Sequence, residues 1–139
     1  MKSEQTLLLI KPDAVERNLI GEILSRVEKE RFQIVDLKMI QLKAEDAKRF
    51  YQVHQEKSFF KDLIDFVSNA SVVAALLSKE NAVKDLRNFV GNTDPAKAEK
   101  GTIRSDFGLD VTRNSVHASD SEESAKFEID FFFNKDLRA

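Results

Sequence analysis

Cysteine is absent from this chain of 139 residues, and histidine occurs only twice. Without cysteine, disulfides and thiolate metal sites are excluded. The two histidines lack the spacing of a zinc motif, so a role in metal binding alone is weakly supported. Glycine occurs four times and proline twice. Where these residues cluster, regular structure is expected to stop.

Neither sign of charge dominates the chain. Lys and Arg number 22 and Asp and Glu 24, so the formal net charge is −2. This balance argues against a general nucleic-acid binder, although it leaves room for a local basic pocket. The N-terminal apolar run, residues 7–10, is too short for a signal peptide or a membrane span. With 42% hydrophobic residues, we predict one cytoplasmic domain over residues 1–139, without a membrane or a specific nucleic-acid partner.

Apolar spacing predicts four strands with helices between them. Strands are expected at residues 6–11, 32–40, 71–77 and 115–119. In the second strand, Val35, Leu37 and Met39 are expected to share one face. Helical stripes are formed by Ile20, Ile23, Leu24 and Val27, by Ala47, Phe50, Tyr51 and His54, by Phe60, Leu63, Ile64 and Val67, and by Val83, Leu86 and Val90.

Residues 91–114 show no sustained period and contain three of the four glycines and one proline. Loops longer than about 12–15 residues are uncommon and are usually functional or disordered. After this stretch, Val116 and Ala118 alternate with His117, and Asp120 and Ser121 can cap a last helix, with Glu123 completing a capping box. The order of elements predicts an α+β fold, a βαββαβ sandwich with helices packed on a sheet.

Phosphate is the first ligand to consider, and the usual glycine-rich cradles are missing. The chain contains neither G-x-x-x-x-G-K-S/T nor G-x-G-x-x-G, so side chains must bind any phosphate. It also lacks the G-x-S-x-G turn of serine hydrolases. A single arginine is more often solvated than functional. The available cations are Lys11, Arg87, Arg104 and Arg113, and the neutral donors are Thr93 and Asn114.

His117 has two ordinary interpretations, as a core histidine or as a surface residue. Glu128 favours a third interpretation, because helical geometry places it about 40° from Phe132, at the edge of the apolar face. A carboxylate there needs a partner. An imidazole N–H is suitable, and this bond would fix the tautomer and free the other ring nitrogen as a nucleophile. Ser119 could bridge the two side chains.

These residues resemble a known family. The stretch "NSVHASDS", followed by "ESAKFEIDFFF", resembles the N-x-x-H-G-S-D-S signature of nucleoside diphosphate kinases. The likeness extends to "TLLLIKPDAVERNLIGEIL", "FYQVHQEKSFF" and "ENAVKDLRNFVGNTDPAKAEKGTIRSDF". It implies a ferredoxin-like fold with an antiparallel four-stranded sheet. It also implies transfer of a γ-phosphoryl group from a nucleoside triphosphate to a diphosphate, by ping-pong through a phosphohistidine.

The resemblance also assigns roles to individual residues. His117 matches the phosphorylated histidine, and Glu128 and Ser119 match the pair that orients it. Tyr51 matches the tyrosine near the transferring phosphoryl group. The positions that match ribose contacts are Lys11 and Asn114, those that match phosphate contacts are His54, Arg87, Thr93 and Arg104, and those that sandwich the base are Phe59 and Val111. Mg²⁺ is expected to be held by phosphates and water, since no carboxylate cage is visible.

Some positions depart from the family pattern. Ala118 replaces a glycine beside His117, and we expect it to be tolerated because it alternates away from the imidazole. Ala70-Ser71 replaces Gly-Pro, and Lys79 and Lys100 replace a glycine and a proline. These changes, together with the short C-terminal segment, favour a tetramer of paired dimers over a hexamer. A non-catalytic binding module is the alternative function, although it would not need a nucleophile.

Overall fold

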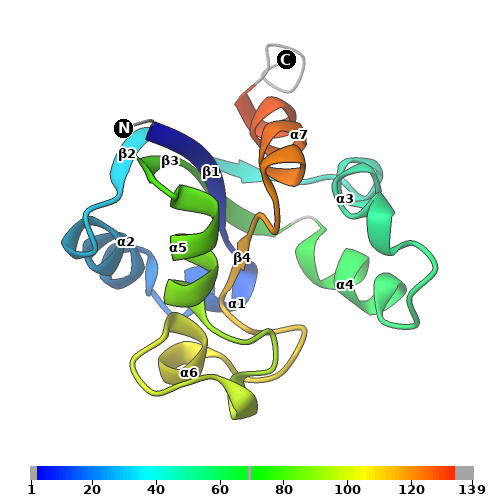
Figure 1. The fold of residues 1–139 in the computed structure, drawn as a ribbon. Helices are drawn as coiled ribbons and strands as arrows, with labels where there is room; N and C mark the ends of the chain where they lie inside the picture. Colours follow the sequence, from blue (N-terminus) through cyan, green and yellow to red (C-terminus); the bar gives the residue numbers. More distant parts are fainter. Residues whose placement is uncertain (1–2, 69, 134–139) are drawn as a thin grey trace.

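The computed structural model describes residues 3–68 and 70–133, in which one antiparallel sheet forms the centre of the fold (Figure 1). The strands are β1 (Ser3–Ile10), β2 (Gln33–Gln41), β3 (Ser71–Glu80) and β4 (Val116–Ala118). Their order is β2-β3-β1-β4, and every pairing is antiparallel. The predicted α+β class and ferredoxin-like sheet are therefore confirmed.

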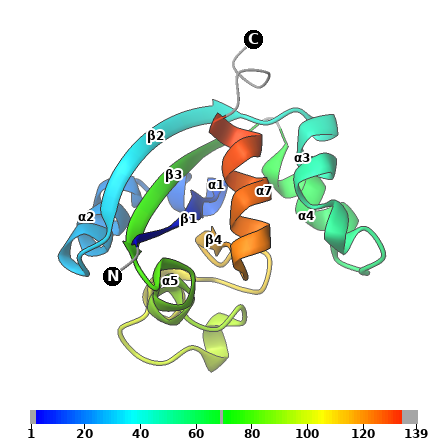
Figure 2. The ribbon, with the colours of Figure 1, turned by 45° about the horizontal axis from the view of Figure 1, so that its top comes forward.

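Helices cover both faces of the sheet, which gives two separate cores (Figure 2). One face packs on α1 (Pro12–Glu16), α2 (Ile20–Lys29), α5 (Ala82–Val90) and α6 (Ile103–Phe107). The other face packs on α3 (Ala44–Phe50), α4 (Phe60–Val67) and α7 (Glu122–Phe133). Along β1, Leu8 and Ile10 belong to the first core and Leu7 and Leu9 to the second. The central strand is buried on both sides, which explains its continuous apolar run.

The short strand β4 carries the predicted nucleophile. Leu9 of β1 lies opposite His117 in the register. Val116 and Ala118 are buried in the core beneath α2 and α5, whereas the His117 ring packs on the other face against Phe50. The predicted alternation is confirmed. The Ala118 side chain thus lies on the face opposite the imidazole, and the tolerance of alanine in place of the family glycine remains a prediction.

Three segments differ from the sequence expectations. The stretch 91–114 contains a 3₁₀ turn, η2 (Pro95–Lys97), and the five-residue helix α6, both too short to show a periodic pattern. The stripe ending at His54 is divided, since α3 stops at Phe50 and a 3₁₀ turn, η1 (Gln52–His54), follows. At the start of α7, Ser121 Oγ accepts from the Ser124 amide at 3.0 Å, so Ser124 rather than Glu123 takes the third helical position.

Candidate active site

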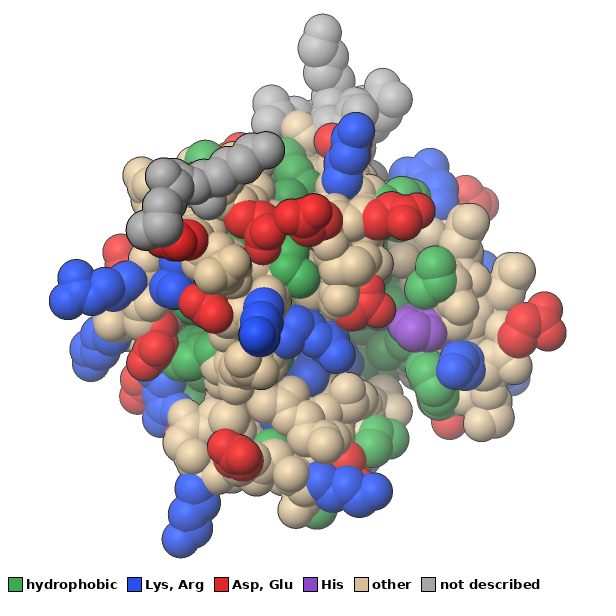
Figure 3. All heavy atoms as spheres, viewed as in Figure 1, with side chains coloured by type: hydrophobic (Ala, Val, Ile, Leu, Met, Phe, Trp, Pro, Cys, Tyr) green, Lys and Arg blue, Asp and Glu red, His purple; other side chains and the backbone are tan. Residues whose placement is uncertain are grey.

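A cavity of about 240 Å³ lies where the end of β1 and β4 meet the 91–115 segment and the α3–α4 side. The surface is hollowed between α4 and α6, and a histidine with several Lys and Arg side chains gathers around this hollow (Figure 3). Ser119 is fully buried behind the wall, and every other residue to which the resemblance assigns a role lines the cavity. These are Lys11, Tyr51, His54, Phe59, Arg87, Thr93, Arg104, Val111, Asn114, His117 and Glu128.

At the inner end of the cavity, His117 is oriented by a carboxylate. His117 Nε2 lies 2.8 Å from Glu128 Oε1, and Ser119 Oγ donates to the same oxygen at 2.7 Å. Glu128 is 8% exposed and Ser119 is fully buried. One carboxylate oxygen thus holds both side chains. With a proton on Nε2, the lone pair of Nδ1 is the one that can react.

Aromatic rings support the imidazole from the core side. The ring centroids of Phe50 and Tyr51 lie 5.3 and 5.9 Å from that of His117, both edge-on. The buried Tyr51 hydroxyl has no hydrogen-bond partner among residues 3–68 and 70–133. Burial, and then the Glu128 charge, raise the pKa of Tyr51 well above its usual value. The phenol therefore remains protonated, and it lines the cavity as a donor without a partner.

Lys11, at the end of β1, connects the sheet to the far wall of the cavity. Its ammonium group donates to Asn114 Oδ1 at 3.0 Å and to the Thr112 carbonyl at 2.6 Å. Burial lowers the pKa of Lys11 to about 8, and the Arg104 charge acts in the same direction. The Asn114 amide also donates to the Thr93 carbonyl at 2.9 Å. The bond between Lys11 and Asn114 joins residues that lie 103 positions apart in the chain.

Two arginines supply positive charge in the middle of the cavity. Arg104 of α6 is 5% exposed and donates to the carbonyls of Gly91 and Val116, each at 2.9 Å. Burial, followed by the charge of Arg87, lowers the pKa of Arg104 to about 10. Arg87 of α5 donates to the Ala118 carbonyl at 3.4 Å. No carboxylate is hydrogen-bonded to either guanidinium in the described chain, which suits them to an anionic ligand.

The outer end of the cavity is apolar and open. Phe59, just before α4, is 40% exposed, and Val111 of the loop is 55% exposed. The ring of His54 lies 5.7 Å from that of Phe59. Burial lowers the pKa of His54, and the nearby His117 adds to this effect. The two predicted base-contacting residues thus come from different segments but line the same cavity.

Asp13 holds the loop against the sheet, a role that the sequence analysis did not anticipate. Its Oδ2 accepts from the Ser115 amide at 3.0 Å, and the Lys11 amide donates to the Ser115 carbonyl at 2.9 Å. Ser115 has a φ of 76°, which is uncommon for a residue other than glycine. Burial raises the pKa of Asp13. An acidic residue directly after Lys11-Pro12 was the signal that could have revealed this contact.

Some lining residues were missed, and one candidate is misplaced. Asp120 and Ser124 line the inner end, and the Ser124 hydroxyl donates to Asp120 at 2.5 Å. Arg113, considered as a phosphate ligand, does not line this cavity. It pairs instead with Asp110 at 2.9 Å near the surface. The sequence predicts helix caps from the acidic and small residues of "HASDS". This prediction does not reveal that Asp120 also lines the cavity. Val53, Leu63, Thr112, Val116 and Ala118 also line it.

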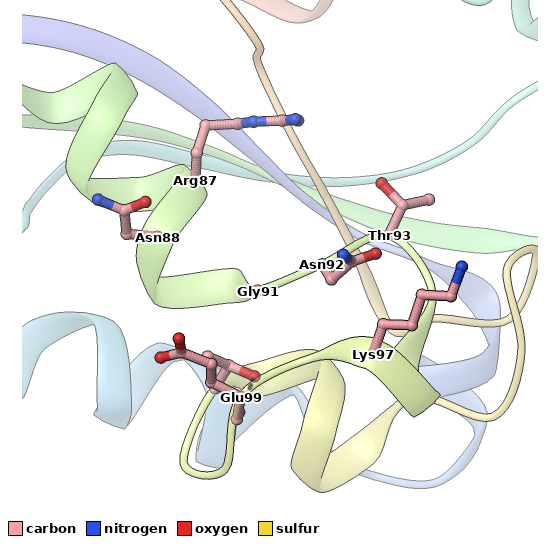
Figure 4. A pocket seen from close by; sticks show the side chains of 8 residues that line it. Arg87, Asn88, Gly91, Asn92, Thr93, Lys97 and Glu99 are labelled. Carbon is pink, nitrogen blue, oxygen red and sulfur yellow. Dashed lines mark hydrogen bonds between the residues drawn. The ribbon is translucent and has the colours of Figure 1, made fainter.

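A second, more open hollow of about 540 Å³ shares Arg87 and Thr93 with this cavity. Figure 4 shows Arg87 projecting from α5 and Thr93 from the loop, while Asn88 and Glu99 point to the other side. The hollow contains neither histidine nor an aromatic ring. It therefore lacks the groups that would react with a nucleotide or stack on its base.

Two further features are absent from the described chain, a cluster of metal-binding side chains and a membrane-spanning helix. Residues 3–68 and 70–133 contain no cluster of three or more His, Cys, Asp or Glu side chains that could bind a metal ion. In the same residues, no helix is long and apolar enough to cross a membrane.

Comparison with known proteins gives a consistent result. Residues 4–137 match the family described as nucleoside diphosphate kinase. The chain is 54% identical to the nucleoside diphosphate kinase of Histophilus somni (strain 129Pt), over 96% of this chain and 94% of that protein. It is 53% identical to that of Geobacter sulfurreducens, over 95% and 96%. The crystal structure of the Aquifex aeolicus nucleoside diphosphate kinase superposes with a TM-score of 0.93, at 46% identity over 96% of this chain and 97% of that chain.

Proposed function

Because the chain belongs to the nucleoside diphosphate kinase family and is a phosphotransferase acting on nucleotides, we propose that it works by ping-pong through a phosphohistidine at His117. The observation that carries this proposal is the bond between His117 Nε2 and Glu128 Oε1, at the inner end of a cavity that contains two arginines. This arrangement leaves one ring nitrogen, Nδ1, for reaction. It also supplies cations for the oxygens of a phosphoryl group.

In the first half-reaction, the Nδ1 lone pair attacks the γ-phosphorus of a nucleoside triphosphate. The bond from that phosphorus to the β–γ bridging oxygen breaks, and the diphosphate leaves with the electron pair. Positive charge develops on the imidazole and is stabilised by Glu128, which Ser119 holds in place. In the second half-reaction, a terminal oxygen of another diphosphate attacks the phosphorus, and the electron pair returns to Nδ1.

The other cavity residues position the nucleotide, which is the main requirement of phosphoryl transfer. Arg87 and Arg104 neutralise phosphate oxygens, with Thr93 and His54 as further donors. The Tyr51 hydroxyl donates near the transferring group, since it is buried and lacks a partner in the described chain. Lys11 and Asn114 bind the ribose hydroxyls. Phe59 and Val111 enclose the base, which is stacked without being read along its edges.

Magnesium is the proposed cofactor, and the residues present suit an ion that arrives with the nucleotide. The described chain provides no cage of three protein ligands, so phosphate oxygens and water would form most of the coordination shell. Asp120 is the carboxylate that lines the phosphate end of the cavity beside Glu128. When bound, the ion would neutralise phosphate charge.

A homo-oligomer is proposed because β2 leaves an apolar strip uncovered in the monomer. Val35, Leu37 and Met39 are 49%, 47% and 58% exposed on this edge strand. Exposed edges and apolar patches favour association. A tetramer of paired dimers is our proposal, with a hexamer as the alternative. The C-terminal residues 134–139, on which the tetramer prediction partly depends, lie outside the described residues. Light scattering distinguishes these assemblies, and a mass of 15.9 kDa would contradict both.

A single domain in the cytoplasm also remains a prediction.

The mechanism is tested by incubating the protein with Mg-ATP and measuring its intact mass. We expect one added phosphoryl group that is labile in acid and removed by any nucleoside diphosphate. His117→Ala should abolish both half-reactions. His54→Ala, which removes the only other histidine, should still be labelled, although more slowly. Labelling of His117→Ala at the wild-type rate would show that the nucleophile is a different residue.

A further inference from the structure

The short helix α6 holds Arg104 in an electrostatically unfavourable place. Its guanidinium is buried, and its pKa is lowered by burial and by the charge of Arg87. Two backbone carbonyls accept from it, those of Gly91 and Val116. A helix of five residues has little stability of its own. Contacts elsewhere in the fold must therefore fix α6 before the nucleotide binds.

Arg26 of α2 provides such contacts from outside the cavity. Its Nη1 lies 2.6 Å from Asp106 Oδ2, and its guanidinium carbon lies 4.6 Å from the centre of the Phe107 ring. Both partners belong to the last turn of α6. The Arg26 side chain is 29% exposed and does not line the cavity. Arg26 thus fixes the end of the helix that carries Arg104.

A second arginine joins this contact to the loop beside the nucleophile. Arg17 donates to the Phe107 carbonyl at 2.6 Å and to Asp13 Oδ2 at 3.3 Å. That same Asp13 oxygen accepts from the Ser115 amide. The end of α6 is therefore tied through Asp13 to the residue after Asn114.

We propose that Arg26 is a positioning residue for nucleotide binding. Through Asp106 and Phe107 it sets α6 so that Arg104 meets the phosphates without reorganisation. The inference rests on the proposed function. Because Arg26 touches neither the imidazole nor the substrate, its loss affects the binding of the nucleotide more than the chemistry at His117.

The test is steady-state kinetics of Arg26→Gln in the full chain. We expect KM for a nucleoside diphosphate to rise about threefold to tenfold, with kcat within about twofold. Arg49→Gln is the matched control, because Arg49 also pairs with an aspartate (Asp46, 3.8 Å) and lies over a phenylalanine ring (Phe131, 5.0 Å). It removes the same charge but does not contact α6. An equal KM change in this control would overturn the proposal, since the effect would then follow net charge.

Exchanging the two charges of the Arg26–Asp106 pair distinguishes a positioning role of Arg26 from an effect on folding. Arg26→Asp and Asp106→Arg alone should each raise KM, and the double variant should recover at least half of the loss. Asp106→Asn provides a milder second measurement if Arg26→Gln unfolds. All assays are run where circular dichroism shows the variants folded. An unchanged KM in Arg26→Gln and Asp106→Asn would refute the positioning role. An inactive wild-type protein would instead refute the proposed function.

Discussion

The two ends of the cavity are built in different ways. At the inner end, His117, Glu128 and Ser119 lie on β4 and α7 or between them, and one buried oxygen accepts from both partners. At the outer end, Phe59 and Val111 are 40% and 55% exposed and lie outside regular helices and strands. A single geometry is fixed at the histidine where the proposed reaction forms and breaks bonds. At the outer end, the Phe59 ring and Val111 provide an exposed apolar surface beside His54.

This difference suits the proposed reaction, in which one phosphoryl transfer is performed on nucleotides with different bases. Side chains on packed helices and strands are held in position with greater precision than side chains on loops. The outer end, by contrast, can accept bases of different size because stacking is tolerant of sequence. We therefore expect changes at the inner end to lower kcat and changes at the outer end to raise KM.

The largest effect is expected for Glu128→Gln. The amide can still bond the imidazole, but it does not stabilise the developing positive charge, so kcat should fall about 10²–10⁴-fold. KM should change much less. Rapid-quench measurement of phosphoenzyme formation from Mg-ATP checks this. Ser119→Ala, which removes one of the two donors to the same oxygen, should lose less. A Glu128→Gln variant with wild-type kcat would contradict the role of the carboxylate.

Phe59→Ala tests the outer end. Removing the stacking ring should weaken nucleotide binding by about 1–3 kcal/mol, seen as a higher KM with kcat retained. The loss should be similar for purine and pyrimidine substrates. Competition between nucleotides in the wild-type enzyme gives a further check. A preference approaching about 10⁴-fold, as in a hydrogen-bonded pocket, would mean that the base is read along its edge.

Gly91→Ala tests how the loop between the two ends is packed. Gly91 has a φ of 92°, and an added Cβ would lie 2.6 Å from Thr102 Oγ1, the side chain that caps α6. Gly101 is the matched control, because its φ of 90° is similar but nothing lies within 4 Å. A positive φ costs about 1–3 kcal/mol in each variant, and the ψ of −177° at Gly91 lies in a region that is essentially restricted to glycine.

Only Gly91→Ala should cost more stability than this in chemical denaturation, and only this variant should raise KM. Equal losses in the two variants would show that backbone strain alone accounts for the effect.

The smallest effect is the pH dependence of Lys11. Its pKa is lowered from 10.5 to about 8 by burial, so the folded protein loses this charge at a lower pH than the unfolded chain does. Nucleotide KM should therefore rise by about fourfold from roughly pH 7 to pH 8.5. Between about pH 8 and 10.5 the unfolded chain binds more protons. This group's contribution to stability then rises with pH while affinity falls.

Lys11→Gln, which lacks the titrating group, should show a higher KM at pH 7 and a flatter profile over the same range. A pH profile identical to that of the wild-type enzyme would mean that another group is responsible.

The sequence predicted the sheet, its helices and the residues that gather at the cavity, because long periodic patterns and a specific motif report directly on them. It did not predict α6, since five residues cannot show a period and the helix is fixed by contacts with Arg17, which follows α1, and with Arg26 of α2. The hydrogen bond between Asp13 and Ser115 was not predicted either, because it joins residues 102 positions apart in the chain. Arg113 was misjudged because a local partner, Asp110, satisfies its charge. Charge alone does not distinguish a ligand from a solvated pair.

The central position of β1 separates opening of the sheet from opening of the loop that carries α6. This strand pairs with β3 along its whole length and with β4 from Leu8 to Ile10, so the amides in this doubly paired part are expected to exchange with deuterated solvent only when the sheet itself opens. Helix α6 has only five residues and is held in place by the Arg17 and Arg26 side chains, so its amides are expected to exchange through smaller local openings. The loop can therefore open to release a nucleotide many times before the strand opposite His117 is disturbed. In the proposed ping-pong reaction, His117 would therefore keep its orientation while one nucleotide leaves and the next one binds.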